Sequence, residues 1–138
     1  EPTELYAAHY EAYIPPASSR SNVIGYNLKG MTDAFRNGDY DLVISLVKNV
    51  PEEDQSNFMN LLLGQSYMQS KRYILAKPVW DKMILENDPY TIDHAKWFQA
   101  LNHLALREVD SAKTILNELA SDAKADHYKE AKALLEAM

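Results

Sequence analysis

The sequence predicts an all-α protein made of about three helical hairpins stacked as an α-solenoid. Three observations predict this class. Apolar residues recur at spacings of three and four along most of the chain, which places them on one face of a helix. No segment shows the strict alternation of apolar and polar residues that indicates a strand. A short pattern returns after 33 and then 36 residues, which is typical of repeats with two helices per unit.

The composition fits one small globular domain. The chain has 138 residues, of which 46% are hydrophobic and 25% charged, close to the usual values of about 45–50% and about 25%. Its net charge is −6 with scattered basic residues, which argues against nucleic acid as a partner because nucleic-acid domains carry a basic patch. No apolar run reaches the roughly 18–20 residues of a membrane span, so no direct membrane insertion is expected. The absence of cysteine excludes disulfides and thiol catalysis.

The repeated pattern marks the turn between two helices. Residues 37–40 (Asn-Gly-Asp-Tyr) and 70–73 (Ser-Lys-Arg-Tyr) each follow one helical run and begin another, and residues 107–110 form a third copy. The anchor position of each copy is Tyr40, Tyr73 or Val109. A compact apolar residue lies three positions after each anchor, and a bulkier one lies four positions further on: Val43, Ala76 and Ala112, then Val47, Trp80 and Leu116.

The first two helices are predicted over residues 22–37 and 39–49. The first carries apolar residues at a spacing of four, three and four, and Gly38 ends it. Asp39 is placed to cap the second. Their apolar faces contain Ile24, Leu28, Met31 and Phe35 in the first helix and Leu42, Val43, Leu46 and Val47 in the second.

The next two helices are predicted up to residue 69 and over 72–86. Pro51 separates the first of them from the preceding helix, and Glu52–Asp54 supply the negative charge that favours a helix N-terminus. Pro78 lies inside the predicted helix 72–86, where a proline removes one backbone hydrogen bond, so a bend or a late start is expected there. Their apolar residues are Phe58, Leu61, Leu62 and Met68, then Ile74, Trp80, Met83 and Ile84.

Three more helices follow. One begins at residue 91 or 93, the next covers about 110–120, and the last covers about 126–137. Pro89 closes the preceding helix. Their apolar residues are Trp97, Leu101 and Leu104, then Ile115, Leu116 and Leu119, then Tyr128, Ala131, Leu134 and Leu135.

The repeat resembles the tetratricopeptide repeat, most closely over residues 57–89. The matching positions are Leu63-Gly64, Tyr67, Tyr73, Ala76, Trp80 and Pro89. The outer copies depart from the family pattern at Met31, Val43, His103 and Val109. The resemblance covers about residues 24–126. It implies a right-handed α-solenoid over 22–138 with a C-terminal capping helix, preceded by a separate segment 1–21.

In the segment 1–21, Tyr6, Tyr10 and Tyr13 are spaced four and three apart and predict an aromatic stripe on a short helix that Pro15-Pro16 ends. The arrangement is similar to repeat proteins of Bacteroidetes-type bacteria, in which such a segment follows a membrane anchor. This likeness implies an extracytoplasmic location behind an upstream anchor, with a cytoplasmic location as the alternative. Because so short a helix is marginal alone, we expect it to dock on the first repeat or in the groove.

The resemblance also implies a noncatalytic scaffold that binds a peptide or helix of a partner protein through an apolar inner groove. Two interpretations of this surface stay open: an exposed groove, or side chains buried between the stacked helices. A structural or linker role with no groove ligand is the alternative function, and self-association is a further one. The predicted groove residues are Leu28, Phe35, Phe58, Leu61, Gln65, Met68, Trp97 and Leu101.

No catalytic, metal or cofactor site is predicted. The sequence has neither a glycine-rich phosphate loop nor a Gly-x-Ser-x-Gly nucleophile turn. The histidines lack zinc-ligand spacing, and the pair His127 and Glu130 is expected to form an ordinary surface contact. Asp122, Asp126 and Glu130 are expected to lie at a solvated helix start.

Overall fold

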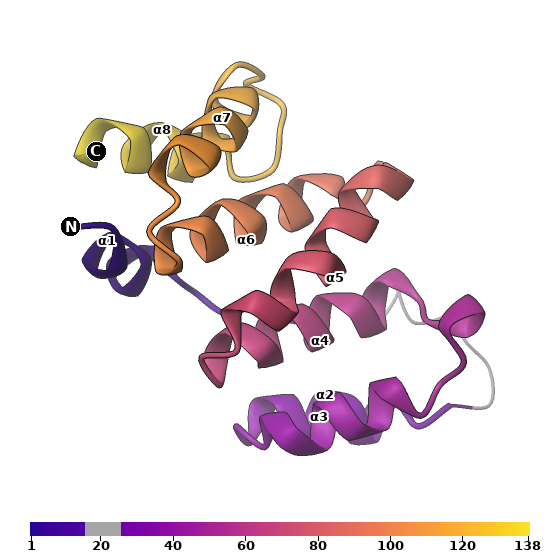
Figure 1. The fold of residues 1–138 in the computed structure, drawn as a ribbon. Coiled ribbons are helices and arrows are strands. Elements are labelled where there is room, and N and C mark those ends of the chain that lie inside the picture. Colours follow the sequence, from indigo (N-terminus) through magenta and orange to yellow (C-terminus); the bar gives the residue numbers. More distant parts are fainter. Residues whose placement is uncertain (16–25) are drawn as a thin grey trace. The chain divides into compact units, whose positions relative to one another are not determined.

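The computed structural model describes residues 1–15 and 26–138, and most of these residues are helical. Helices account for 72% of them, and none lies in a strand. The all-α prediction is therefore confirmed for this part of the chain. The helices of Figure 1 are α1 (Pro2–His9), α2 (Leu28–Arg36), α3 (Tyr40–Lys48), the short 3₁₀ helix η2 (Glu52–Asp54), α4 (Asn57–Gln69), α5 (Tyr73–Glu86), α6 (Ile92–Ala105), α7 (Val109–Ala120) and α8 (Tyr128–Ala137).

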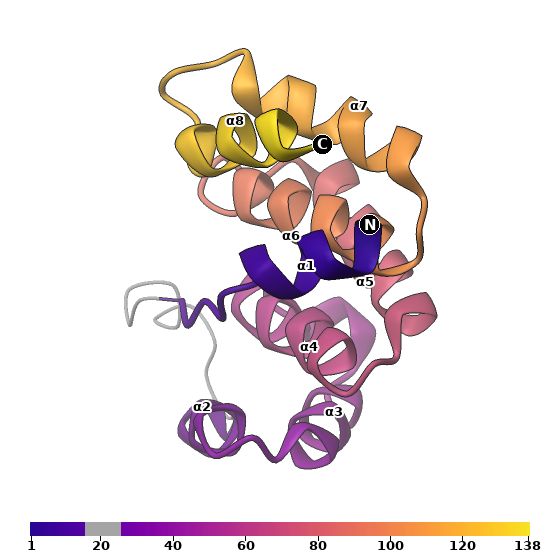
Figure 2. The same cartoon turned by 90° about the vertical axis from the view of Figure 1, so that its left-hand side faces the viewer.

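The described residues form two compact units, each with its own packing. One contains residues 12–79, in which α2, α3 and α4 pack on one another in order and α2 also reaches α4. The other contains residues 1–11 and 80–138, in which α7 packs on α6 and on α8. In this second unit α1 lies against α6 and also contacts α8 (Figure 2). Residues 1–11 and 12–15 thus pack within different units, and the predicted division at residue 21 stays a prediction.

Three turns between helices share one geometry. At each, a residue with positive φ follows the helix: Gly38 (75°), Lys71 (62°) and Arg107 (64°). The next residue donates its N–H to the carbonyl five positions earlier, from Asp39 to Ala34, Arg72 to Tyr67 and Glu108 to His103, at 2.7–2.9 Å. This is the Schellman end of a helix, which satisfies carbonyls that the helix itself leaves unpaired.

These turns recur at the spacing of the sequence repeat. The positive-φ residue precedes each anchor position, Tyr40, Tyr73 or Val109, by two residues. The six compact and bulky positions that follow the anchors are all fully buried: Val43, Ala76, Ala112, Val47, Trp80 and Leu116. The repeat therefore describes a common local structure.

The helix bounds agree with the predicted ranges to within a few residues from α3 onward. Asp39 caps α3 as expected, since its side chain accepts a hydrogen bond from the N–H of Leu42. The start predicted for the first helix, including Ile24, lies outside the described residues, as do Pro16 and the loop of residues 17–21.

Two local predictions need correction. Helix α5 begins at Tyr73 and continues through Pro78, so the late start is wrong, while the bend that was the other expectation stays a prediction. The carbonyl of Ile74 loses its partner there, but Ile74 is 66% exposed and water can replace the missing N–H. Helix α1 ends at His9, so the predicted helical stripe of three tyrosines is wrong. Tyr10 has extended backbone, and the amide of Tyr13 bonds to a side chain instead of a helical carbonyl.

Candidate functional site

Seven of the eight residues predicted to line the groove are buried. Phe35, Phe58, Leu61, Gln65, Met68, Trp97 and Leu101 expose between 0% and 4% of their surface. Leu28, the eighth, is half-buried. These seven side chains therefore lie in the packed interior instead of an exposed groove. Partner binding at these positions stays a prediction.

Gln65 is the polar member of this set, and it binds the main chain of the N-terminal segment. Its Oε1 accepts a hydrogen bond from the N–H of Tyr13 at 2.8 Å. Its Nε2 donates to the carbonyl of Tyr13 at 2.7 Å. Both polar main-chain groups of a residue 52 positions away are thus paired with a single side-chain amide.

A third bond fixes the orientation of the Gln65 amide. Nε2 also donates to the carbonyl of Leu61, one turn earlier in α4, at 3.0 Å. Because two carbonyls face this atom, it must be the nitrogen, and the opposite atom must be the oxygen that accepts from Tyr13. Helix α4 therefore presents a donor and an acceptor in a set order.

The two bonds between Gln65 and Tyr13 follow the pattern of two paired residues in a β-sheet. In an antiparallel ladder, two paired residues exchange an N–H···O bond in each direction. The side-chain amide of Gln65 makes the same exchange with Tyr13. Both of these bonds go to the main chain of Tyr13.

The surroundings of Tyr13 complete this site. Tyr13 and Ile14 are half-buried and Pro15 is buried, all in a stretch without helix or strand. On α4 every residue from Phe58 to Met68 is buried. Leaving a buried amide unpaired costs roughly 1–3 kcal/mol, and the bonds to Tyr13 remove this cost for Gln65.

The first part of the N-terminal segment docks through aromatic rings. Tyr6 and Tyr10 lie 5.6 Å apart between ring centroids. Tyr10 lies 5.9 Å from Phe98 of α6. These separations are in the range of favourable aromatic pairs. Tyr10 and α1 therefore dock on α6, a helix outside the first repeat, and docking in the groove stays a prediction.

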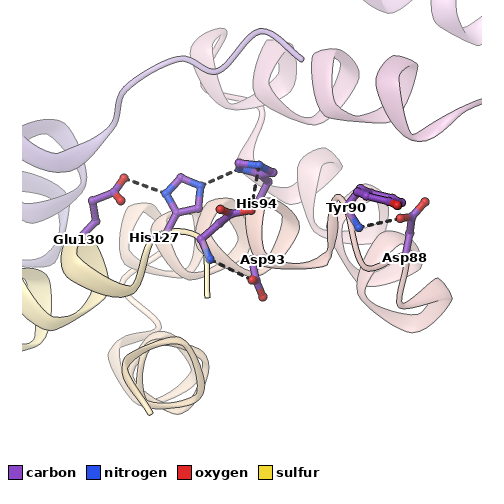
Figure 3. A network of polar contacts seen from close by, with 7 residues as sticks. Asp88, Tyr90, Asp93, His94, His127 and Glu130 are labelled. Atoms are coloured by element: carbon purple, nitrogen blue, oxygen red, sulfur yellow. Dashed lines mark hydrogen bonds and ion pairs between the residues drawn. The ribbon is translucent and has the colours of Figure 1, made fainter. Parts of the chain in front are cut away.

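A second polar cluster joins α6 to the start of α8 (Figure 3). His94 Nδ1 lies 2.8 Å from His127 Nε2, and His127 Nδ1 lies 2.8 Å from Glu130 Oε2. The contact of His127 with Glu130 was expected, whereas His94 was missed. His94 and His127 are 33 positions apart, and this separation equals one repeat length. The spacing is the feature of the sequence from which the pair could have been predicted.

Burial lowers the pKa of His94, and the neighbouring His127 lowers it further. The carboxylates of Asp126, Asp93 and Glu130 act in the opposite direction. The neutral ring is therefore the favoured form of His94 in the folded chain.

Residues 1–15 and 26–138 contain no group of three or more histidine, aspartate and glutamate side chains that could hold a metal ion. None of their helices combines the length and apolar character that crossing a membrane requires.

Comparison with known proteins gives no relative: no family model, no curated protein and no solved structure matches this chain.

Proposed function

We propose that this chain is a noncatalytic protein-interaction module of the tetratricopeptide-like class, which binds an extended segment of a partner protein along α4. The observation that carries the proposal is the double hydrogen bond between the buried amide of Gln65 and the main chain of Tyr13. The chain's own residues 12–15 occupy the site in cis and act as an internal ligand that a partner displaces.

The repeat geometry supports the assignment to this class. The three Schellman turns recur at spacings of 33 and 36 residues, and the compact position after each anchor is fully buried. Short helical pairs of this kind bury their apolar faces by stacking on their neighbours. An extracytoplasmic location behind a membrane anchor remains a prediction from the family resemblance alone.

A structural or linker role is the second candidate, and burial of the predicted groove favours it. If residues 12–15 are a permanent part of the core, no partner segment replaces them. The two functions differ in whether the site can be vacated and refilled.

The test supplies the segment in trans. A chain that lacks residues 1–16, shown by circular dichroism to keep its helices, is titrated with a synthetic peptide of residues 1–16 in a calorimeter. We expect saturable one-to-one binding. Gln65→Met keeps the length of the side chain but removes its hydrogen bonds, and we expect it to weaken binding about tenfold, since tenfold is about 1.4 kcal/mol and lies within the range for lost hydrogen bonds.

A helical deletion variant that does not bind the peptide would contradict the interaction module and favour the structural role. Equal binding by the Gln65→Met variant would contradict the role assigned to Gln65.

A further inference from the structure

The pair formed by His94 and His127 sits within a chain of four polar groups. Asp126 Oδ2 lies 3.6 Å from His94 Nε2, the two rings meet at 2.8 Å, and Glu130 Oε2 lies 2.8 Å from His127 Nδ1. Carboxylates therefore stand at both ends, with four ring nitrogens between them (Figure 3). Asp93 on α6 lies nearby and accepts from the N–H of Asp126 at 3.1 Å.

The number of protons on these four nitrogens decides whether the two rings can stay hydrogen-bonded to each other. Two neutral rings hold two protons, one directed at Glu130 and one shared between the rings. A third proton satisfies the end at Asp126 as well. A fourth proton places N–H groups of both rings opposite each other, and because neither nitrogen then has a free lone pair, the bond between the rings is lost.

His127, the residue before the first turn of α8, also contacts α6 through its ring. Its ring stacks on Trp97 with a centroid distance of 5.3 Å and an angle of 7° between planes. Its carbonyl accepts the N–H of Ala131 at 2.8 Å, which forms the first turn of α8. Its backbone has a φ of 67°, a conformation that is unfavourable for a residue with a side chain and persists where surrounding contacts hold it.

We propose that the His94–His127 pair is a proton-operated latch, which holds the first turn of α8 on α6 until both rings are protonated. The carboxylates of Asp126, Asp93 and Glu130 favour a proton on His94. The burial of His94 and the neighbouring His127 ring oppose it and have the larger effect, so the pKa of His94 is lowered. Opening exposes His94 and returns its pKa toward about 6.5, so opening takes up a proton and becomes easier as the pH falls below that value.

Amide hydrogen exchange of the full chain tests the latch. The N–H of Ala131 reports the first turn of α8, and the N–H of Ala112, bonded to Glu108 at 3.1 Å, reports the first turn of α7. After correction for the intrinsic effect of pH, we expect the protection of Ala131 to fall by up to about tenfold per pH unit below pH 6.5. The protection of Ala112 should stay constant.

Two variants identify which histidine causes the pH dependence of protection at Ala131. His94→Gln removes the titrating ring and should abolish the pH dependence at Ala131. His103→Gln is the matched control, because His103 also lies on α6 and also bonds a carboxylate, Glu108, at 2.8 Å, and it should leave that dependence unchanged. The latch is refuted if the protection of Ala131 and that of Ala112 change alike with pH in the unaltered chain, a comparison that needs no variant. It is also refuted if the pH dependence at Ala131 survives in His94→Gln.

Discussion

Single residues set the main features of this molecule, and Gln65 is the most informative among them. A glutamine in the middle of an otherwise apolar helix would be costly to bury without partners. Its three hydrogen bonds to Tyr13 and Leu61 remove that cost. The sequence placed Gln65 on the inner face but could not identify its partner, because the partner is main chain and carries no residue-specific mark.

At the same scale, Trp80 tests the register of the central repeat. Trp80 is fully buried and stacks on Phe98 with a centroid distance of 5.3 Å. We expect Trp80→Ala to lower the free energy of unfolding by roughly 3–5 kcal/mol, the usual effect of truncating a large buried aromatic residue. Urea denaturation measures the change.

Tyr90 provides the control, since it is 84% exposed. Tyr90→Ala should change the free energy of unfolding by less than about 0.5 kcal/mol. A loss below about 1 kcal/mol for Trp80→Ala would show that Trp80 does not support the core.

At the scale of elements, the positions of helix ends could be predicted better than the backbone conformation of the turns that follow them. Gly38 and Asp39 carry the residue types that end one helix and begin the next, and the structure confirms both roles. Lys71 and Arg107 adopt the same positive φ as Gly38, although neither residue type favours it. Only their place in the repeat indicates it. The end of α1 at His9 was missed because the bond that holds Tyr13 comes from a distant helix.

Gly38 offers a clean measurement of this turn. Its φ is 75°, and a Cβ built there would meet no atom within 4 Å. Gly38→Ala therefore adds backbone strain without a clash, and we expect a loss of about 1–2 kcal/mol in the free energy of unfolding, the usual penalty for a left-handed residue with a side chain. Urea denaturation again gives the value.

Lys71→Gly is the reverse substitution at the equivalent turn. It relieves the same strain and should leave the free energy of unfolding unchanged or raise it. A loss in Lys71→Gly as large as that in Gly38→Ala would mean that the positive φ does not govern the stability of these turns.

At the scale of the whole molecule, the chain comprises two compact helical units, and residues 1–15 contribute to both. Residues 1–11 belong to the unit of α6–α8, and residues 12–15 to that of α2–α4. The sequence could identify this stretch as aromatic and in need of a docking surface. It could not predict that the stretch is divided between the two units. The residues that follow it along the chain belong to the unit of α2–α4, whereas residues 1–11 pack in the unit of α6–α8.

Helix α4 is proposed to recognise the backbone of a bound segment through Gln65. The most direct measurement compares two peptides of residues 1–16, identical except that one carries a methyl group on the amide nitrogen of Tyr13. Both are titrated into the chain that lacks residues 1–16. We predict that methylation weakens binding about tenfold or more in the chain with Gln65 and has little effect in Gln65→Met. Equal affinities of the two peptides for the chain with Gln65 would contradict the claim.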